Sequence, residues 1–244
     1  MPYFDDAVNL SRDQINQLQV ARLRETVERA RKAPAYAERL AGLSADDIQR
    51  PEDIRKLPLT SKAQLREGMP WGYLAVPRCE VVRMHYSSGT TGLATAIYHT
   101  RGDLHRWSEC VVRGMLAAGV TEDDIFQNMM GYGLFTGGLG FHYAGELLGC
   151  MTIPASSGNT ERQIHLMQSF GTTVLHIIPS YALRVLHFCD QAGIDASRDL
   201  SVRVIFVGGE PHSEQLRRRI EEGFGCKVYN CYGLSEMAGP GIAM

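Results

Sequence analysis

The chain has 244 residues, with 25 Lys plus Arg against 27 Asp plus Glu and a formal net charge of −2. Its hydrophobic share of 44% and charged share of 21% are ordinary for a globular protein and exclude a disordered or collagen-like chain. The balanced charge offers no electrostatic basis for binding nucleic acid or an anionic membrane, and no apolar run approaches the roughly 20 residues of a membrane span. Six cysteines without a Cys-x-x-Cys pair predict free thiols in a reducing cytoplasm.

Residues 1–77 predict a helical N-terminal subdomain. Residues 11–32 combine a Ser11–Gln14 capping box with apolar residues at helical spacing, and Pro34 marks the end of that helix. Further prolines then separate short amphipathic pieces. We therefore expect a domain boundary after residue 77.

From residue 78 to residue 244, predicted strands alternate with predicted helices. The strand patterns cover residues 81–86, 94–99, 125–130, 150–153, 173–178, 202–207 and 226–230. Helices are predicted at residues 100–118 and 212–223 and after Thr160 and Pro179. This alternation favours an α/β fold with a mostly parallel sheet flanked by helices. Ligands of such sheets bind beyond the carboxyl ends of the strands, which is where the glycine-rich segments of this chain fall.

A loop rich in hydroxyl groups follows the strand predicted at residues 81–86. It reads Ser87-Ser88-Gly89-Thr90-Thr91-Gly92. Glycines allow backbone N–H groups to approach a phosphate closely, and hydroxyls donate to its oxygens. The spacing differs from that of a Walker A loop. Taken alone, the loop fits a phosphate cradle and an ordinary surface turn about equally well.

Two more candidate loops follow strands near the end of the chain. In Gly208-Gly209-Glu210-Pro211 the glycines would let a flat ring lie against the backbone, although taken alone the tetrapeptide fits a tight turn before a helix better. In the segment 230–236, Tyr232 offers a stacking face, Ser235 a phosphate donor and Glu236 an oxygen ligand for Mg²⁺. Gly233-x-Ser235 also begins like the nucleophile elbow of a serine hydrolase, but the closing glycine of that motif is absent.

The combination SSGTTG, GGEP and YGLSE, in that order and each after a strand, resembles the adenylate-forming (acyl-activating) enzyme superfamily. The phrases MHYSSGTTG, GYGLFTGGLGFHYAGE, IIPSYAL, VGGEP and YGLSEMAGPG resemble one branch of it, the phenylacetate–coenzyme A ligases. The resemblance covers nearly the whole chain. It implies a cytoplasmic, AMP-forming ligase that activates an aryl acetate with ATP and transfers the acyl group to coenzyme A.

The resemblance also implies roles on the nucleotide side. The positions that match the β- and γ-phosphate loop are Ser87, Ser88, Gly89, Thr90, Thr91 and Gly92, with Thr90 also expected to be catalytic. The positions that match the adenine segment are Gly208, Gly209, Glu210 and Pro211. Those of the last loop are Asn230 for the adenine amino group, Tyr232 for stacking on the ring, and the neighbouring Gly233. Ser235 matches the α-phosphate contact and Glu236 the Mg²⁺ ligand, and both are expected to be catalytic.

On the acyl side, the resemblance implies a pocket for an aromatic acid. Its matching positions are Tyr132, Phe135, Gly137 and Gly138, flanked by Pro179 and Ser180. His85 and His142 lie next to the motifs in sequence and are the histidines placed to approach a substrate. Phenylacetate, indoleacetates and hydroxyaryl acetates fit the pattern equally.

The chain departs from the family pattern in two places. Leu93 stands where family members often carry a lysine near the phosphates. The sequence stops at Met244, so we expect a truncated large domain that lacks the ribose-binding aspartate, the hinge and the catalytic lysine of the family. Such a chain is expected to self-associate and not to complete the ligase reaction alone. A non-catalytic nucleotide- or acyl-binding module and a serine hydrolase using Ser235 are the alternatives.

Overall fold

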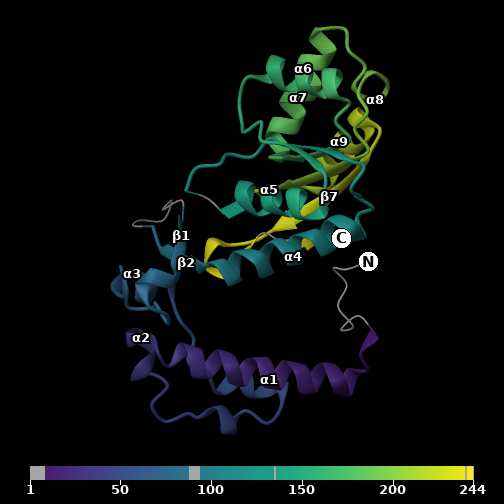
Figure 1. Cartoon of the computed structure of the whole chain (residues 1–244). Coiled ribbons are helices and arrows are strands. Elements are labelled where there is room, and N and C mark those ends of the chain that lie inside the picture. Colours follow the sequence, from purple (N-terminus) through teal and green to yellow (C-terminus); the bar gives the residue numbers. More distant parts are fainter. Residues whose placement is uncertain (1–8, 88–93, 135, 240, 244) are drawn as a thin grey trace. The chain divides into compact units, whose positions relative to one another are not determined.

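The structure is a computed structural model that describes residues 9–87, 94–134, 136–239 and 241–243. It divides into two compact units, Met1–Gly102 and Asp103–Met244 (Figure 1). The domain boundary predicted after residue 77 stays a prediction. In the part of the chain that is described, no helix combines the length and apolar composition needed to cross a bilayer.

The first unit begins with helices and 3-10 turns. Its elements are α1 (Arg12–Ala30), α2 (Pro34–Ala37), η2 (Ala45–Asp47), η3 (Pro51–Lys56), α3 (Lys62–Glu67) and η4 (Arg78–Glu80). The predicted capping box starts α1: Ser11 N donates to Gln14 Oε1 at 2.8 Å, and Gln14 N donates to Ser11 Oγ at 3.3 Å. These two bonds satisfy backbone donors that a helix start leaves unpaired. The first predicted helix is therefore confirmed.

The first unit ends in a hairpin. Strands β1 (Val81–Tyr86) and β2 (Ala96–Thr100) pair antiparallel, from Val81 opposite Thr100 to Tyr86 opposite Ala96. They form a two-stranded sheet of their own, separate from the larger sheet of the second unit. The SSGTTG loop therefore joins two strands of a hairpin and does not join a strand to a helix.

The second unit is built on a six-stranded sheet in the order β4-β3-β5-β6-β7-β8. Its strands are β3 (Ile125–Asn128), β4 (Met151–Ile153), β5 (Val174–Ile177), β6 (Val204–Gly208), β7 (Lys227–Tyr232) and β8 (Gly241–Ala243). All neighbours pair parallel except β7 and β8. The predicted α/β fold with a mostly parallel sheet is confirmed.

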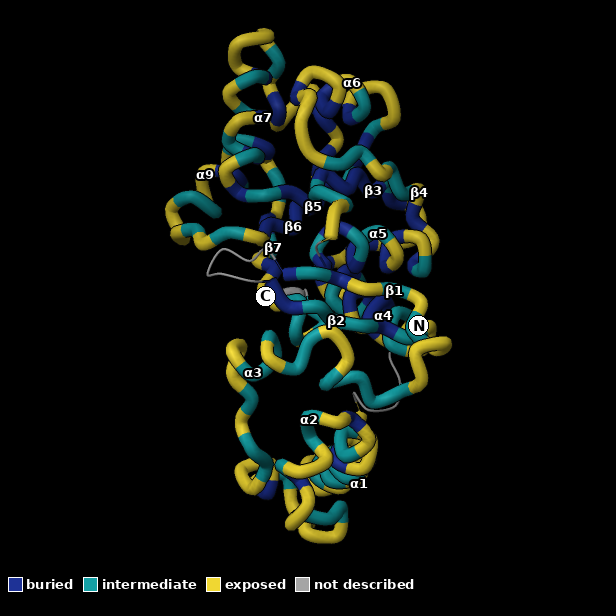
Figure 2. The backbone as a smooth tube through the Cα atoms, turned by 90° about the vertical axis from the view of Figure 1, so that its left-hand side faces the viewer, coloured by how far each residue is buried: buried dark blue, intermediate teal, exposed yellow. Residues whose placement is uncertain are grey.

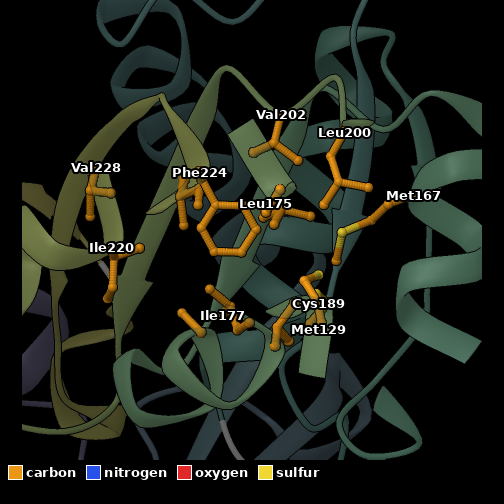
Figure 3. Close-up of a cluster of buried hydrophobic side chains, with 14 of the residues drawn as sticks. Met129, Met167, Leu175, Ile177, Cys189, Leu200, Val202, Ile220, Phe224 and Val228 are labelled. Carbon is orange, nitrogen blue, oxygen red and sulfur yellow. The ribbon is translucent and has the colours of Figure 1, made fainter. Parts of the chain in front are cut away.

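Helices cover both faces of this sheet. The helices are α4 (Arg101–Ala117), α5 (Thr136–Leu148), α6 (Thr160–Phe170), α7 (Pro179–Gln191), α8 (Ala196–Asp199) and α9 (Glu214–Phe224). One apolar cluster joins α6, α7 and α9 to β5, β6 and β7 through side chains such as Leu175, Cys189 and Ile220 (Figure 3). On the opposite face, Phe141 of α5 packs against Phe206 of β6 with ring centroids 5.2 Å apart. Because both faces are covered, β5 and β6 are buried along their whole length (Figure 2).

Helix α5 occupies the glycine-rich stretch, where no helix was predicted. Its glycines are sites of close packing. A Cβ on Gly140 would collide with the Trp107 ring of α4, and a Cβ on Gly145 would lie 2.6 Å from Thr152 Oγ1 and 2.7 Å from Phe126. The low helix propensity of glycine is thus outweighed by tertiary contact, since only glycine lets α5 approach its neighbours so closely.

Truncation of a central core side chain tests this packing. Leu175 is completely buried in β5, so Leu175→Ala should lower the free energy of unfolding by about 2–5 kcal/mol through lost burial and the cavity left behind. Urea titration measures the change. Met151→Ala, at a strand position that is 51% exposed, is the matched control and should stay within about 0.5 kcal/mol of the parent. Equal effects of the two substitutions would contradict the assigned core.

Candidate active site

The strand order of the sheet reverses at β3 and β5, and this switch point is where ligands of open α/β sheets are expected to bind. The chain runs from β3 to β4 on one side, then crosses back to β5 on the other side and continues to β6 and β7. Such a reversal leaves room between the loops that leave adjacent strands, and ligands of open α/β sheets bind there. The loops after β3, β5, β6 and β7 all belong to this edge. They contain the candidate site residues that lie in the second unit.

The loop after β6 is held by a carboxylate. Glu210 Oε1 accepts a hydrogen bond from Ser180 N at 2.6 Å, and Ser180 lies in the first turn of α7, directly after Pro179. A negative charge is favourable there because helix N-termini carry unpaired N–H groups and a partial positive charge. Gly209 has a left-handed φ of +86°, which its lack of a side chain allows. Glu210 thus ties the GGEP loop to the N-terminus of α7.

The loop after β7 begins beside the GGEP loop, because Gly208 is in register with Cys231. Asn230 and Tyr232 share the strand face of Val228, and the Tyr232 side chain is 66% exposed. After Gly233, a 3-10 turn, η5 (Ser235–Met237), carries Ser235 and Glu236. Adenine and phosphate groups could therefore be reached from one end of β7.

A hydroxyl pair connects this loop to the acyl side of the site. Thr136 Oγ1, at the start of α5, donates to Ser235 Oγ at 3.0 Å across a separation of 99 residues. The sequence analysis did not single out Thr136. The contact also bears on the hydrolase alternative, because a threonine hydroxyl cannot serve as the general base that a serine nucleophile needs.

A cavity of about 680 Å³ lies next to β7 and α9, and half of its lining residues are charged. Its lining residues are His212, Glu214, Arg217, Glu221, Lys227, Val228, Tyr229 and Asn230. Arg217 is engaged by Glu214 and Glu221 at 2.7 and 2.6 Å. Of the predicted site residues that the structure describes, Asn230 alone lines this cavity, so the cavity does not coincide with the predicted site.

On the acyl side, Tyr132 follows β3 and its hydroxyl lies 3.3 Å from His142 Nδ1. Burial raises the pKa of Tyr132 to about 12, the Glu146 carboxylate acts in the same direction and a hydrogen bond with Asn128 opposes it. Gly137 and Gly138 lie in the first turn of α5, and a Cβ on Gly138 would collide with the carbonyl oxygen of Gly131. Gly138 thereby lets the loop after β3 lie directly on the helix. Phe135 is outside the described residues.

A buried polar pair that the sequence analysis missed lies at the switch point itself. His176 Nδ1 is 3.2 Å from Asn128 Oδ1, and the two residues are in register on β5 and β3. Asn128 Nδ2 also donates to Gly138 O at 2.6 Å, and Met130 N donates to Asn128 Oδ1 at 3.3 Å. The signal in the sequence is weak: both are single polar residues at the ends of apolar strands.

The phosphate-loop candidates belong to the first unit. Ser87 N donates to Thr95 O at 2.9 Å, while Thr95 N and Thr95 Oγ1 donate to Ser87 Oγ at 2.9 and 3.1 Å. The Ser87 hydroxyl therefore ties together the two ends of the loop. Ser88, Gly89, Thr90, Thr91, Gly92 and Leu93 lie outside the described residues, and their roles stay predictions.

The SSGTTG loop is rich in glycine and hydroxyl groups, and the GGEP and YGLSE loops lie at the carboxyl edge of a parallel sheet. Loops of this kind are typical of α/β enzymes that bind nucleotides. The model of the AMP-binding enzyme family matches residues 21–244. The chain therefore belongs to the AMP-binding enzymes, and the resemblance seen in its motifs is confirmed.

Within this family, the chain is similar to particular coenzyme A ligases. The chain is 43% identical over 243 residues to the phenylacetate-coenzyme A ligase of Pseudomonas putida, covering 98% of this chain and 55% of that protein. It is 41% identical over 244 residues to the enzyme of the same description from Escherichia coli (strain K12), covering 98% and 56%. The chain spans about half the length of the curated relatives it matches. The structure of 2-hydroxyisobutyryl-CoA ligase in complex with 2-HIB-AMP and CoA aligns with a TM-score of 0.87 and 26% identity over 94% of this chain and 51% of that one.

The buried His176 predicts a pH dependence of stability. Burial lowers its pKa from 6.5 to about 3, so the unfolded chain binds a proton below pH 6.5 that the folded chain refuses until pH 3. Stability should therefore fall with acidification in this window, by up to about 1.4 kcal/mol per pH unit from this group. His176→Gln, which retains a donor for Asn128 but does not titrate, should flatten the slope between pH 5 and 6.5, above the range of ordinary carboxylates. Urea unfolding at several pH values measures it, and parallel curves for the two proteins would refute the assignment.

Proposed function

We propose that this chain forms the nucleotide- and acyl-binding part of an AMP-forming ligase that activates an aryl acetate with ATP and passes the acyl group to coenzyme A. The observation that carries the proposal is the placement of GGEP and YGLSE at the carboxyl ends of adjacent parallel strands, with Gly208 opposite Cys231. The 43% identity to a phenylacetate-coenzyme A ligase supports the choice of reaction.

Each nucleotide contact is assigned to a residue at this edge. Asn230 would accept from the adenine amino group, and Tyr232 would stack on the ring with its exposed face. Ser235 would donate to the α-phosphate, while the hydroxyls of Ser88, Thr90 and Thr91 and the loop N–H groups would take the β- and γ-phosphates. Ser87 would act at the base of that loop, where its hydroxyl is engaged by Thr95.

The donor set fits a magnesium ion bound together with substrate phosphates. Mg²⁺ prefers one or two carboxylates plus phosphate oxygens, and Glu236 offers a carboxylate one residue from the proposed α-phosphate contact. No group of three or more His, Cys, Asp or Glu side chains within the described ranges could hold a metal by itself. When bound, the ion would neutralise charge that builds up on the polyphosphate during transfer.

The proposed reaction has two balanced steps. A carboxylate oxygen of the acid attacks the α-phosphorus of ATP, the bond to the β-phosphate oxygen breaks, and pyrophosphate leaves. The sulfur of coenzyme A then attacks the acyl carbon, AMP leaves, and the thiol proton is released. The residues of this chain contribute by holding the carboxylate in line with the α-phosphorus and by donating hydrogen bonds where negative charge develops.

The acid would bind between the loop after β3 and the start of α5. Tyr132 and Phe135 would provide flat walls, and Gly137, Gly138 and Pro179 would line the remainder. An aromatic ring suits such a site because apolar and aromatic side chains supply most of the affinity of small-molecule pockets.

Loss of the stacking face should weaken nucleotide binding. Tyr232→Ala should reduce ATP affinity by about 1–3 kcal/mol, the range typical of base stacking on aromatic side chains. Isothermal titration calorimetry of ATP binding measures it. Tyr143→Ala, another exposed tyrosine but on α5, is the control and should leave ATP affinity unchanged; unchanged affinity in Tyr232→Ala would remove the assigned adenine site.

The acyl pocket should prefer an aromatic acid. Burial of a ring contributes about 1.5–3 kcal/mol, so kcat/KM for phenylacetate should exceed that for acetate by about ten- to a hundredfold. Pyrophosphate release by a full-length version of the enzyme, with each acid at saturating ATP, measures the preference. Better activation of acetate than of phenylacetate would contradict the aryl assignment.

A further inference from the structure

A chain of polar side chains runs along α5 to the loop after β3. The Glu146 carboxylate, whose side chain is 55% exposed, lies 3.2 Å from His142 Nε2. The same imidazole, 17% exposed, lies 3.3 Å from the Tyr132 hydroxyl through Nδ1. The rings of Tyr132 and His142 also meet edge to face, with centroids 5.5 Å apart and an interplanar angle of 87°. His142 is therefore held between a carboxylate and a phenol.

The partners decide which nitrogen of the neutral imidazole carries the proton. A carboxylate only accepts hydrogen bonds, so the Glu146 carboxylate 3.2 Å from Nε2 favours the tautomer with its proton on Nε2. Nδ1 is then the acceptor, and the Tyr132 hydroxyl must donate to it. Glu146 thus determines the direction of the bond between His142 and Tyr132.

The other side of Tyr132 is held from the buried end of the network. Asn128 acts on the phenol by lowering its pKa against the effect of burial, and the same side chain bonds His176 and the carbonyl oxygen of Gly138. His176 is in turn stacked on Phe141 with centroids 3.8 Å apart. The phenol of Tyr132 is fixed between a helix-borne imidazole and the polar pair at the switch point.

We propose that His142, oriented by Glu146, is a positioning residue that fixes the Tyr132 ring as a rigid wall of the acyl pocket and so sets the affinity for aromatic acids. The proposal rests on the proposed function and deepens it. If the Tyr132 ring is already held in place, less conformational entropy is lost when a flat ring binds against it. The affinity for the acid should therefore rise, whereas the affinity for ATP should not change.

Two substitutions of one residue separate positioning from general damage. In a full-length version of the enzyme, His142→Leu removes the acceptor and should raise KM for phenylacetate about three- to tenfold, the equivalent of one hydrogen bond, with KM for ATP within about twofold of the parent. His142→Asn, whose Oδ1 can take the place of Nδ1, should restore most of the loss. Tyr132→Phe should match His142→Leu, and the double variant should be no worse than either single one.

The chain offers a matched control in another helix. His105 and Glu109 of α4 form the same i, i+4 pair at 3.4 Å, and the His105 side chain is 63% exposed. His105→Leu should leave KM for both substrates unchanged. An equal effect of His105→Leu and His142→Leu would overturn the proposal.

Imidazole ¹⁵N NMR tests the network without relying on activity. In the parent, His142 should show a protonated Nε2 and an unprotonated Nδ1; Glu146→Gln should preserve this state, and Glu146→Leu should shift the tautomer population. An inverted tautomer in the parent, or an unchanged KM for phenylacetate in His142→Leu, would overturn the positioning role while leaving the proposed function intact. The predicted tautomer in a protein that activates no aryl acid would overturn the proposed function and with it the pocket role.

Discussion

The hydrogen bond between Asn128 and His176 is the constraint on which the arrangement of the site depends. It joins β3 to β5 at the point where the strand order reverses. Both groups are buried, so leaving either unpaired would cost about 1–3 kcal/mol. A shift of β3 against β5 would separate them, and the pair therefore favours the observed strand register in addition to stabilising the fold. The pKa of His176, lowered by burial, keeps the imidazole neutral near neutral pH, which spares the core an unpaired charge.

Further hydrogen bonds connect this pair to the start of α5 and, through it, to the loop after β7. Asn128 holds the carbonyl of Gly138 and thereby the start of α5. Thr136, in the same first turn, donates to Ser235 in the loop after β7. A displacement of β3 against β5 would therefore move the start of α5 and the loop after β7 together. Enzymes that act mainly by positioning need this kind of support, since misplacement of about 1 Å can cost a hundredfold in rate.

Much of the fold could be predicted from the sequence because the relevant signals are local. The β-branched run at residues 173–178 indicates a buried strand, and the Ser11–Gln14 box marks the start of α1. Helix α5 could not be found in this way, because its glycines speak against a helix until Trp107 and Phe126 are known to lie against them. The pairing of β1 with β2 in a separate sheet has no local signal either, since strand patterns do not name their partners.

In the candidate site, too, the residues with a local sequence signal could be predicted and their distant partners could not. Motif residues such as Gly209 and Ser235 could be placed because spacing after a strand determines where a loop residue lies. The partners that hold them could not: Ser180 is 30 residues from Glu210 in sequence, and Thr136 is 99 residues from Ser235. A sequence shows which groups can meet a ligand, whereas the groups that hold those residues in place are distributed over the whole sheet.

The supporting bonds also explain how glycine-rich loops can be precise. Glycine allows close approach of the backbone to a ligand but loses more conformational freedom on ordering than any other residue. Three glycine segments of the second unit are tied to a neighbouring element by a side-chain hydrogen bond: Glu210 joins GGEP to α7, Asn128 joins β3 to α5, and Thr136 joins α5 to the loop after β7. The ordering cost is met during folding and not during binding. Removal of any of these hydrogen bonds should therefore weaken ligand binding even where no ligand contact is lost.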